Sequence, residues 1–169
     1  MFDKIGDLPS HPLMVHLPVV LLPLATLGMI AMVVRPRLVP HYGWLTTALA
    51  GVGFVGTVLA ASSGESLEEA YEESGMAISD TLRDHGEMGE TVRLLSLLFF
   101  VLVLAWMLVR RWRAKVGEEK ATARLKNPKV VVGTLAALAI ALGAVATVTM
   151  TLTAHNGAKS HWEGTLVEE

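Results

Sequence analysis

Four long stretches without charged side chains constrain this chain more than any other feature. No Asp, Glu, Lys or Arg occurs in residues 13–34, 41–64, 94–109 or 130–158. A helix of about 20 apolar residues is long enough to cross about 30 Å of hydrocarbon. The pattern therefore predicts an all-α integral membrane protein, an up-down bundle of four transmembrane helices near residues 12–34, 42–62, 86–110 and 129–155. Little chain remains outside them, so we expect one membrane domain over residues 1–169.

The composition excludes several classes of function. The chain contains no cysteine, which excludes disulfides, thiolate metal sites, iron–sulfur clusters and thioether-attached haem. Residues 51–56 match the letters GxGxxG, but they lie within a predicted membrane helix with no strand before it, which argues against dinucleotide binding. The same small residues favour close helix packing, as do Gly133 and Gly143. Nothing indicates nucleic-acid binding or a hydrolytic or transferase site. No charged residue lies at mid-membrane depth, which argues against an ion channel or a proton-coupled transporter.

The distribution of basic residues predicts the topology. The segments that join helices 1 to 2 and 3 to 4 carry ten of the 14 Lys and Arg residues, whereas the termini and the central loop carry 14 of the 16 acids. The positive-inside rule then places the basic side in the cytoplasm and both termini outside a cytoplasmic (inner) membrane. We expect Trp44, Trp106 and Trp112 near the inner interface and Trp162 near the outer one.

Local signals predict where helices begin and end. Ser66 to Glu69 matches a capping box, which predicts a short helix as far as Ser74 with Gly75 as its stop. Ser79 or Asp80 is a second start, from which the third helix carries His85 towards the membrane. Residues 115–129 resemble a solvated, mobile loop, and Pro128 suits the first turn of the fourth helix.

Histidines gather at one end of the predicted bundle. His11 and His16 open the first helix, His85 opens the third, His155 ends the fourth and His161 follows it. Ionisable side chains at membrane depth are costly and mostly functional. Imidazoles can ligate haem iron or another metal, relay protons, or form structural hydrogen bonds. The cluster of His16, His85 and His155 therefore predicts a site near the extracytoplasmic face.

Haem b suits two imidazoles on facing helices of an apolar bundle. Helices 1 and 3 of an up-down bundle are diagonal, so His16 and His85 are the first candidate pair of axial ligands. Gly86 and Gly89 would allow a macrocycle to approach the backbone. The same side carries Arg83 and Arg93, which could neutralise propionates. His155 is an alternative partner, and His11 with His155 is a candidate pair for a second ring or ion.

Two other functions compete with a membrane-embedded haem protein that transfers electrons. The histidines, with the soft thioethers of Met14, Met76, Met88 and Met150, suit a copper- or zinc-handling protein. Alternatively, the chain is a non-redox structural subunit whose histidines only form hydrogen bonds. A single haem near the outer face cannot carry electrons across the membrane, so the haem hypothesis predicts membrane or periplasmic redox subunits as partners. The acidic run from Glu65 to Glu73 would suit docking of a basic soluble partner.

Four short motifs are spread over nearly the whole chain: His11-Pro12-x-x-Val15-His16-x-Pro18, Ser63-Gly64, His85-Gly86 and Thr153-Ala154-His155-Asn156-Gly157. Together they resemble a family of predicted membrane proteins, domain of unknown function 2231, and the first of them resembles the opening motif of that family. The resemblance implies a four-helix membrane protein with its histidines at one face, and makes His11, His16, His85 and His155 the candidate positions. The last element departs from the family pattern, because Ala154 and Asn156 flank His155.

Overall fold

The computed structural model describes residues 4–5, 8–75 and 78–165, and the side chains of residues 10–75 and 78–159. Its elements are β1 (Lys4–Ile5), β2 (Leu8–Pro9), α1 (His11–Met14), α2 (His16–Val34), η1 (Pro36–Leu38), α3 (Val39–Glu73), α4 (Asp80–Val116), α5 (Glu118–Leu125) and α6 (Pro128–Thr165). The two short strands pair antiparallel before α1. Apart from short turns, the remainder of the described chain is helical, in agreement with the predicted all-α class.

Four helical segments are long and apolar enough to cross a membrane. They are His11–Val34, Pro36–Glu73, Asp80–Val116 and Pro128–Lys159. Large apolar side chains cover their outer faces: Leu27 is 61% exposed, and Leu94 and Val148 are similarly open. Hydrocarbon rather than water suits such a surface. The four predicted membrane helices are therefore confirmed.

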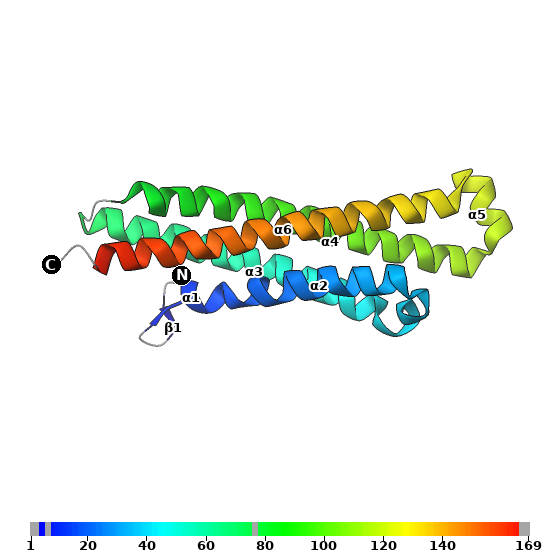
Figure 1. The fold of residues 1–169 in the computed structure, drawn as a ribbon, viewed down its shortest axis with the longest axis horizontal. Coiled ribbons are helices and arrows are strands. Elements are labelled where there is room, and N and C mark those ends of the chain that lie inside the picture. Colours follow the sequence, from blue (N-terminus) through cyan, green and yellow to red (C-terminus); the bar gives the residue numbers. More distant parts are fainter. Residues whose placement is uncertain (1–3, 6–7, 76–77, 166–169) are drawn as a thin grey trace.

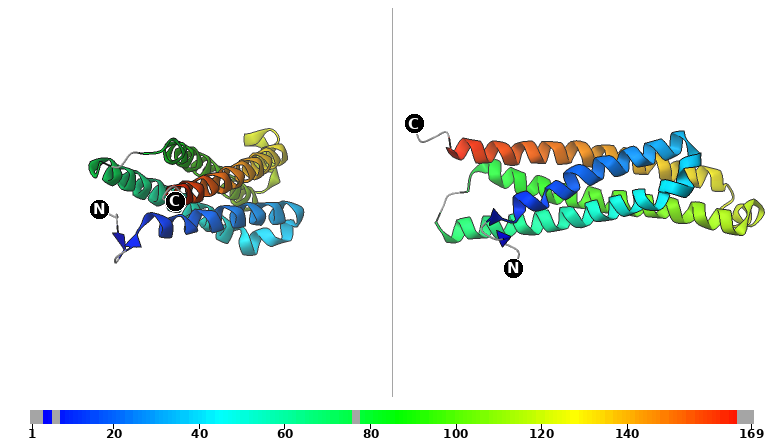
Figure 2. Two further views of the ribbon diagram at one scale, coloured as in Figure 1. Left: turned by 60° about the vertical axis from the view of Figure 1, so that its left-hand side comes forward. Right: turned by 90° about the horizontal axis from the view of Figure 1, so that it is seen from below.

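The long helices form an antiparallel bundle of four (Figures 1 and 2). Helix α2 packs against α3 and α6, and α4 packs against the same two helices. Helices α2 and α4 therefore occupy opposite corners, as the sequence predicts for an up-down bundle. We call the end that holds the start of α1, the end of α3, the start of α4 and the end of α6 the histidine end. The opposite end, which carries α5, is the basic end (Figure 1).

Small residues bring the helices close together. A β-carbon on Gly56 would lie 2.8 Å from Leu17 and 2.9 Å from Pro18, so α3 can approach α2 here only without a side chain. On α6, a β-carbon on Gly143 would lie 2.5 Å from Thr26 Oγ1. The packing role of these glycines is confirmed, whereas Gly133 faces open space. Between α3 and α4, the buried hydroxyls of Thr57 and Ser96 are hydrogen-bonded at 2.8 Å.

Three local signals for helix boundaries are confirmed, whereas α3, α4 and α6 extend beyond the predicted ranges 42–62, 86–110 and 129–155. Helix α3 ends just before Gly75, whose φ of +76° is in the left-handed region that glycine tolerates. Ser79 caps α4 by accepting a hydrogen bond from the Leu82 amide at 3.2 Å. Helix α6 begins at Pro128.

Two local predictions are wrong. Ser66 does not start a new helix: α3 runs through it without interruption, and its hydroxyl donates to the Ser62 carbonyl at 3.2 Å. The membrane helix supplies the amide partners that a capping box would otherwise provide. The expected loop over residues 115–129 contains α5, because Ala121 is buried against the bundle and Arg113 bridges to Glu118 at 2.8 Å.

The tryptophans divide between interface and core. Trp44 is 45% exposed at the basic end, as an interfacial residue should be. Trp106 is only 1% exposed and belongs to the hydrophobic core, so its ring packs inside the bundle and does not face lipid as a belt residue would. The periodicity of α4 places it on the inner face with Phe99 and Val103. The side chain of Trp162 lies outside the described residues.

Candidate functional site

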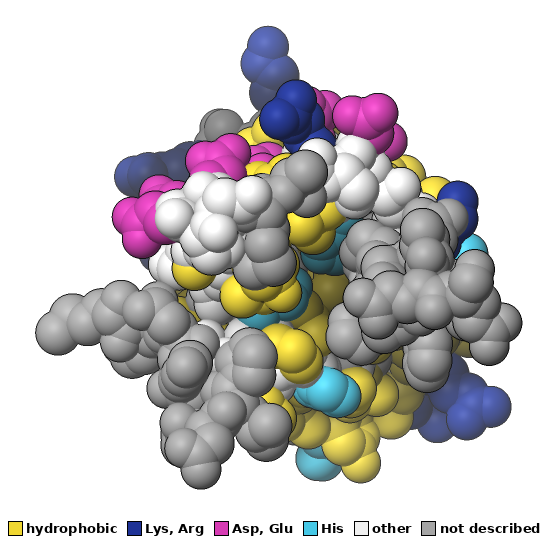
Figure 3. Space-filling model, turned by 90° about the vertical axis from the view of Figure 1, so that its left-hand side faces the viewer, with side chains coloured by type: hydrophobic (Ala, Val, Ile, Leu, Met, Phe, Trp, Pro, Cys, Tyr) yellow, Lys and Arg dark blue, Asp and Glu magenta, His cyan; other side chains and the backbone are white. Residues whose placement is uncertain are grey.

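Two histidines from opposite corners of the bundle meet at the histidine end. The ring centroids of His11, on α1, and His85, on α4, are 5.9 Å apart, and the ring planes are nearly perpendicular at 89°. Both side chains are half-buried. Figure 3 views this end of the molecule and shows histidine side chains among hydrophobic ones at its centre.

Helix α3 holds the ring of His11 in place. Its Nδ1–H donates to the carbonyl oxygen of Ala60 at 2.9 Å and lies 3.3 Å from the Ser63 hydroxyl. The ring lies over Gly64, where a β-carbon would be 3.2 Å from His11 Cε1. The Ser63-Gly64 pair therefore gives the His11 ring a polar partner and a helix face free of side chains; we call Gly64, and the equivalent Gly157 below His85, the glycine contact of the ring.

Helix α6 holds the ring of His85 in the same manner. Its Nδ1–H donates to the carbonyl oxygen of Thr153 at 2.9 Å. The ring lies over Gly157, where a β-carbon would be 2.7 Å from His85 Cε1. The short elements at 63–64 and 153–157, which look unrelated in the sequence, thus have the same structural role.

The two backbone hydrogen bonds set the tautomer of both rings. A carbonyl oxygen only accepts, so Nδ1 of His11 and of His85 each carries a proton. In the neutral ring Nε2 then holds the lone pair. This is the usual state of a metal-ligating histidine, whose second nitrogen donates to a backbone carbonyl that fixes the ring orientation.

The structure places His11, not His16, beside His85. His16 is exposed on α2, five residues after His11 and therefore on another face of the chain. His155 is also exposed, because Thr153 and Gly157 take the inward-facing positions of α6. The structure therefore brings together two of the four histidines singled out by the sequence. The side chain of His161 lies outside the described residues.

The glycines and arginines expected to accompany the ligands surround the histidine pair but do not hold either ring. Gly86 is exposed, with a β-carbon position 3.7 Å from Glu68, whereas Gly89 faces open space one turn below His85. Arg93 is ion-paired with Glu90 on its own helix, and Arg83 is exposed. The two arginines therefore lie outside the histidine pair.

The thioether of Met88 is carried by α4, one helical turn after His85. Its sulfur is 3.1 Å from Asn156 Nδ2 on α6. Met150 is buried in the core, Met14 is half-buried, and Met76 lies outside the described residues. Within the described part of the chain, no group of three or more His, Cys, Asp or Glu side chains is arranged to hold a metal ion.

The decisive partners of this site were missed by sequence reasoning because they are backbone atoms. Nothing in the residue types of Ala60 or Thr153 indicates that their carbonyls anchor imidazoles. A signal was present in the glycines, since Gly64 and Gly157 each lie four residues after an anchoring carbonyl. A residue i+4 from a carbonyl lies on the same helix face, where only glycine leaves room for a ring.

Comparison with known proteins agrees with the motifs. A family model described as "Predicted membrane protein (DUF2231)" matches residues 7–168. No curated protein matches significantly, and neither does any solved structure. The match covers almost the whole chain, including His11, His85 and the glycine contacts Gly64 and Gly157. The chain therefore belongs to the DUF2231 family of predicted multi-pass membrane proteins.

Proposed function

We propose that this protein binds haem b between His11 and His85 and serves as an electron-transfer subunit of a larger membrane complex. The observation that carries the proposal is the pair of facing imidazoles, each anchored through Nδ1 to a backbone carbonyl of a neighbouring helix. Two histidines on opposite helices are the protein ligands that a bis-imidazole haem iron requires.

The donor set favours haem over zinc. Structural zinc sites use four protein ligands and catalytic ones three, and the described residues contain no such group. Haem iron takes four of its ligands from the macrocycle and needs only an axial pair. With ring centroids 5.9 Å apart, His11 and His85 are close enough that both imidazoles would hold one metal atom between them.

The residues around the pair would bind and orient the group. Ala60 and Thr153 fix the rings, and Gly64 and Gly157 keep the adjacent helix faces free of side chains. When bound, haem would supply a one-electron centre, and the surrounding apolar helices would limit its access to water. A centre at one end of the bundle requires a partner with further redox centres to move charge across the membrane.

The charge pattern suggests how the protein is oriented in the membrane and which kind of partner it binds. The ten basic residues at the basic end favour a cytoplasmic position for α5, and in that orientation the imidazole pair would lie near the extracytoplasmic face of an inner membrane. Glu68, Glu69 and Glu72 lie near the end of α3, beside the start of α4. A basic soluble redox protein would be attracted to this surface.

A second candidate function is copper handling. It is favoured by Met88, whose thioether sulfur follows His85 by one helical turn and faces Asn156 of α6. Thioether and imidazole ligands together suit Cu(I). In this alternative His11, His85 and Met88 would be the ligands.

The test is an absorbance spectrum of the full-length protein purified in detergent from cells supplied with a haem precursor. A Soret band that shifts on dithionite reduction, with one haem per chain, is expected. A flat spectrum would contradict haem binding. Elemental analysis of the same sample then separates copper from a structural subunit, which would contain neither copper nor haem and would be recovered with partner proteins.

A further inference from the structure

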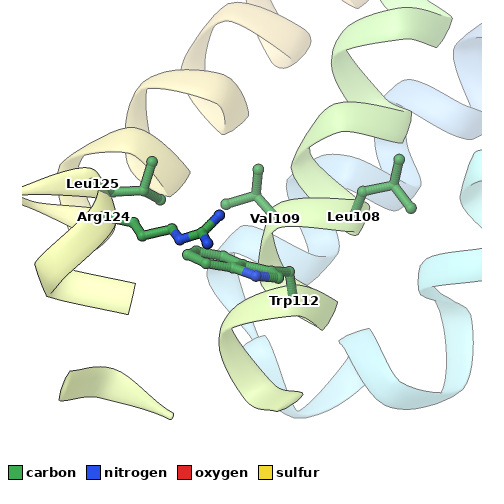
Figure 4. A pocket seen from close by; sticks show the side chains of 5 residues that line it. All are labelled: Leu108, Val109, Trp112, Arg124 and Leu125. Carbon is green, nitrogen blue, oxygen red and sulfur yellow. The ribbon is translucent and has the colours of Figure 1, made fainter. Parts of the chain in front are cut away.

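An open groove lies at the basic end, far from the histidine pair. It is formed by the last apolar turn of α4 together with α5, and its lining residues are Leu108, Val109, Trp112, Arg124 and Leu125. Figure 4 shows the Arg124 side chain extending from α5 towards Trp112 and Val109. The groove thus combines apolar walls with one guanidinium.

The groove lies where the apolar span of α4 ends. Leu108 and Val109 are the last residues of the uncharged stretch 94–109, and Arg110 and Arg111 follow it. Tryptophan at such a position is typical of the headgroup level of a bilayer. The end of the uncharged stretch would place the walls of the groove beside lipid chains and Arg124 at the depth of their phosphates.

Arg124 differs from Arg110 and Arg113, the two nearby arginines of α4 that have partners within the protein. Arg113 is bridged to Glu118 at 2.8 Å, and Arg110 lies 4.9 Å from the centroid of the Trp106 ring. Arg124 is exposed, and no carboxylate among the described residues forms an ion pair with it. An unneutralised guanidinium above an apolar groove is complementary to a phosphate that carries an acyl chain.

We propose that this groove is a binding site for an anionic phospholipid of the surrounding bilayer, independent of haem binding. The phosphate lies against the Arg124 guanidinium, and an acyl chain runs along Leu108 and Val109. Trp112 lies between the two regions and contacts the glycerol part of the lipid.

The test uses tryptophan quenching by lipids with brominated acyl chains. The full chain is reconstituted into phosphatidylcholine vesicles that contain the same low mole fraction of brominated phosphatidylglycerol or brominated phosphatidylcholine. Subtracting the emission of Trp112→Phe isolates the signal of Trp112. We expect phosphatidylglycerol to occupy the site about fivefold more strongly, the effect of about 1 kcal/mol per basic residue near an anionic lipid surface.

Arg124→Gln should abolish that preference, with each variant measured against its own Trp112→Phe counterpart. Arg37→Gln is the matched control: it removes one charge at the same end but from the connection between α2 and α3, outside the groove. It should keep the fivefold preference. Equal quenching by both lipids in the unmodified protein would overturn the proposal. So would an equal loss in Arg37→Gln, which would indicate diffuse surface charge.

Inorganic phosphate distinguishes a lipid site from a free-anion site. Adding it at constant ionic strength should leave quenching by brominated phosphatidylglycerol unchanged, since phosphate has no acyl chain for the apolar walls. Relief of quenching by phosphate, but not by chloride, would show that the groove selects the free anion and would overturn the lipid assignment.

Discussion

The ring centroids of His11 and His85 lie 5.9 Å apart although the two residues are 74 positions apart in the chain. Each ring is fixed by a helix other than its own: His11 by α3 and His85 by α6. All four corners of the bundle therefore contribute to one site. A change that shifts any one helix at this end should therefore alter the positions of both imidazoles.

The first prediction separates the observed pair from the pair that the sequence suggested. His11→Ala and His85→Ala should each abolish the haem spectrum, because either removes one axial ligand. His16→Ala and His155→Ala should retain it, since both side chains are exposed. Haem content per chain, measured on protein of equal helicity, checks this. Loss of the spectrum in His16→Ala but not in His11→Ala would favour the pair of His16 and His85 that the sequence suggests.

The second prediction concerns Gly157, the glycine of α6 over which the His85 ring lies. In Gly157→Ala the new β-carbon would lie 2.7 Å from His85 Cε1, so the ring must move. We expect the free energy of unfolding to fall by about 1–3 kcal/mol, the usual cost of overpacking, with a loss of haem or metal occupancy.

Gly133→Ala on the same helix is its control, because a β-carbon there meets nothing within 4 Å. It should be neutral or stabilise α6 by up to about 1 kcal/mol, the difference in helix propensity between alanine and glycine. Denaturant titrations in detergent measure both variants. Equal stability of Gly157→Ala and Gly133→Ala would show that the ring of His85 is not held against α6.

The third prediction concerns the hydrogen bond between Thr57 and Ser96. It joins α3 to α4 in the core at 2.8 Å. A double-mutant cycle with Thr57→Val and Ser96→Ala should give a coupling of about 0.6 kcal/mol, the average for such bonds between membrane helices. Thr151→Val, at an exposed site on α6, is the matched control and should show no coupling to Ser96→Ala. A coupling near zero for the buried pair would indicate that backbone carbonyls satisfy both hydroxyls independently.

The fourth prediction concerns pH and the start of α5. The hydrogen bond from Arg113 lowers the pKa of Glu118 below its ordinary value of 4.5. A carboxylate with a lowered pKa in the folded state stabilises that state above its ordinary pKa, and the contribution is lost as the pH falls through the lowered value. Glu118→Gln should therefore reduce hydrogen-exchange protection of the α5 amides at neutral pH and have no effect in acid.

Glu119→Gln is the control for that measurement, since it changes the same residue type one position away, where no ion pair with Arg113 is formed. It should leave protection of the α5 amides at neutral pH nearly unchanged. A loss of protection in Glu118→Gln that persists below the lowered pKa of Glu118, where the carboxyl group is protonated, would show that the ion pair with Arg113 is not its cause.

Hydropathy and charge in the sequence were enough to determine the membrane bundle. Four uncharged stretches of the chain require four buried or lipid-facing helices, and short connections require neighbouring helices to run antiparallel. Gly75, Ser79 and Pro128 mark their boundaries through backbone preferences that act locally. The end of the bundle that carries the histidines follows from the order of the helices alone.

Only the tertiary structure decided which histidines meet. His11 and His16 are both at the start of the first membrane segment, and no local signal distinguishes them. The turn at Val15 and the packing of Gly56 against Pro18 set the rotation of that segment, which directs His11 inward and leaves His16 exposed. The anchors of the two rings are backbone carbonyls, which every residue possesses, so their roles depend on how helices far apart in the sequence pack together.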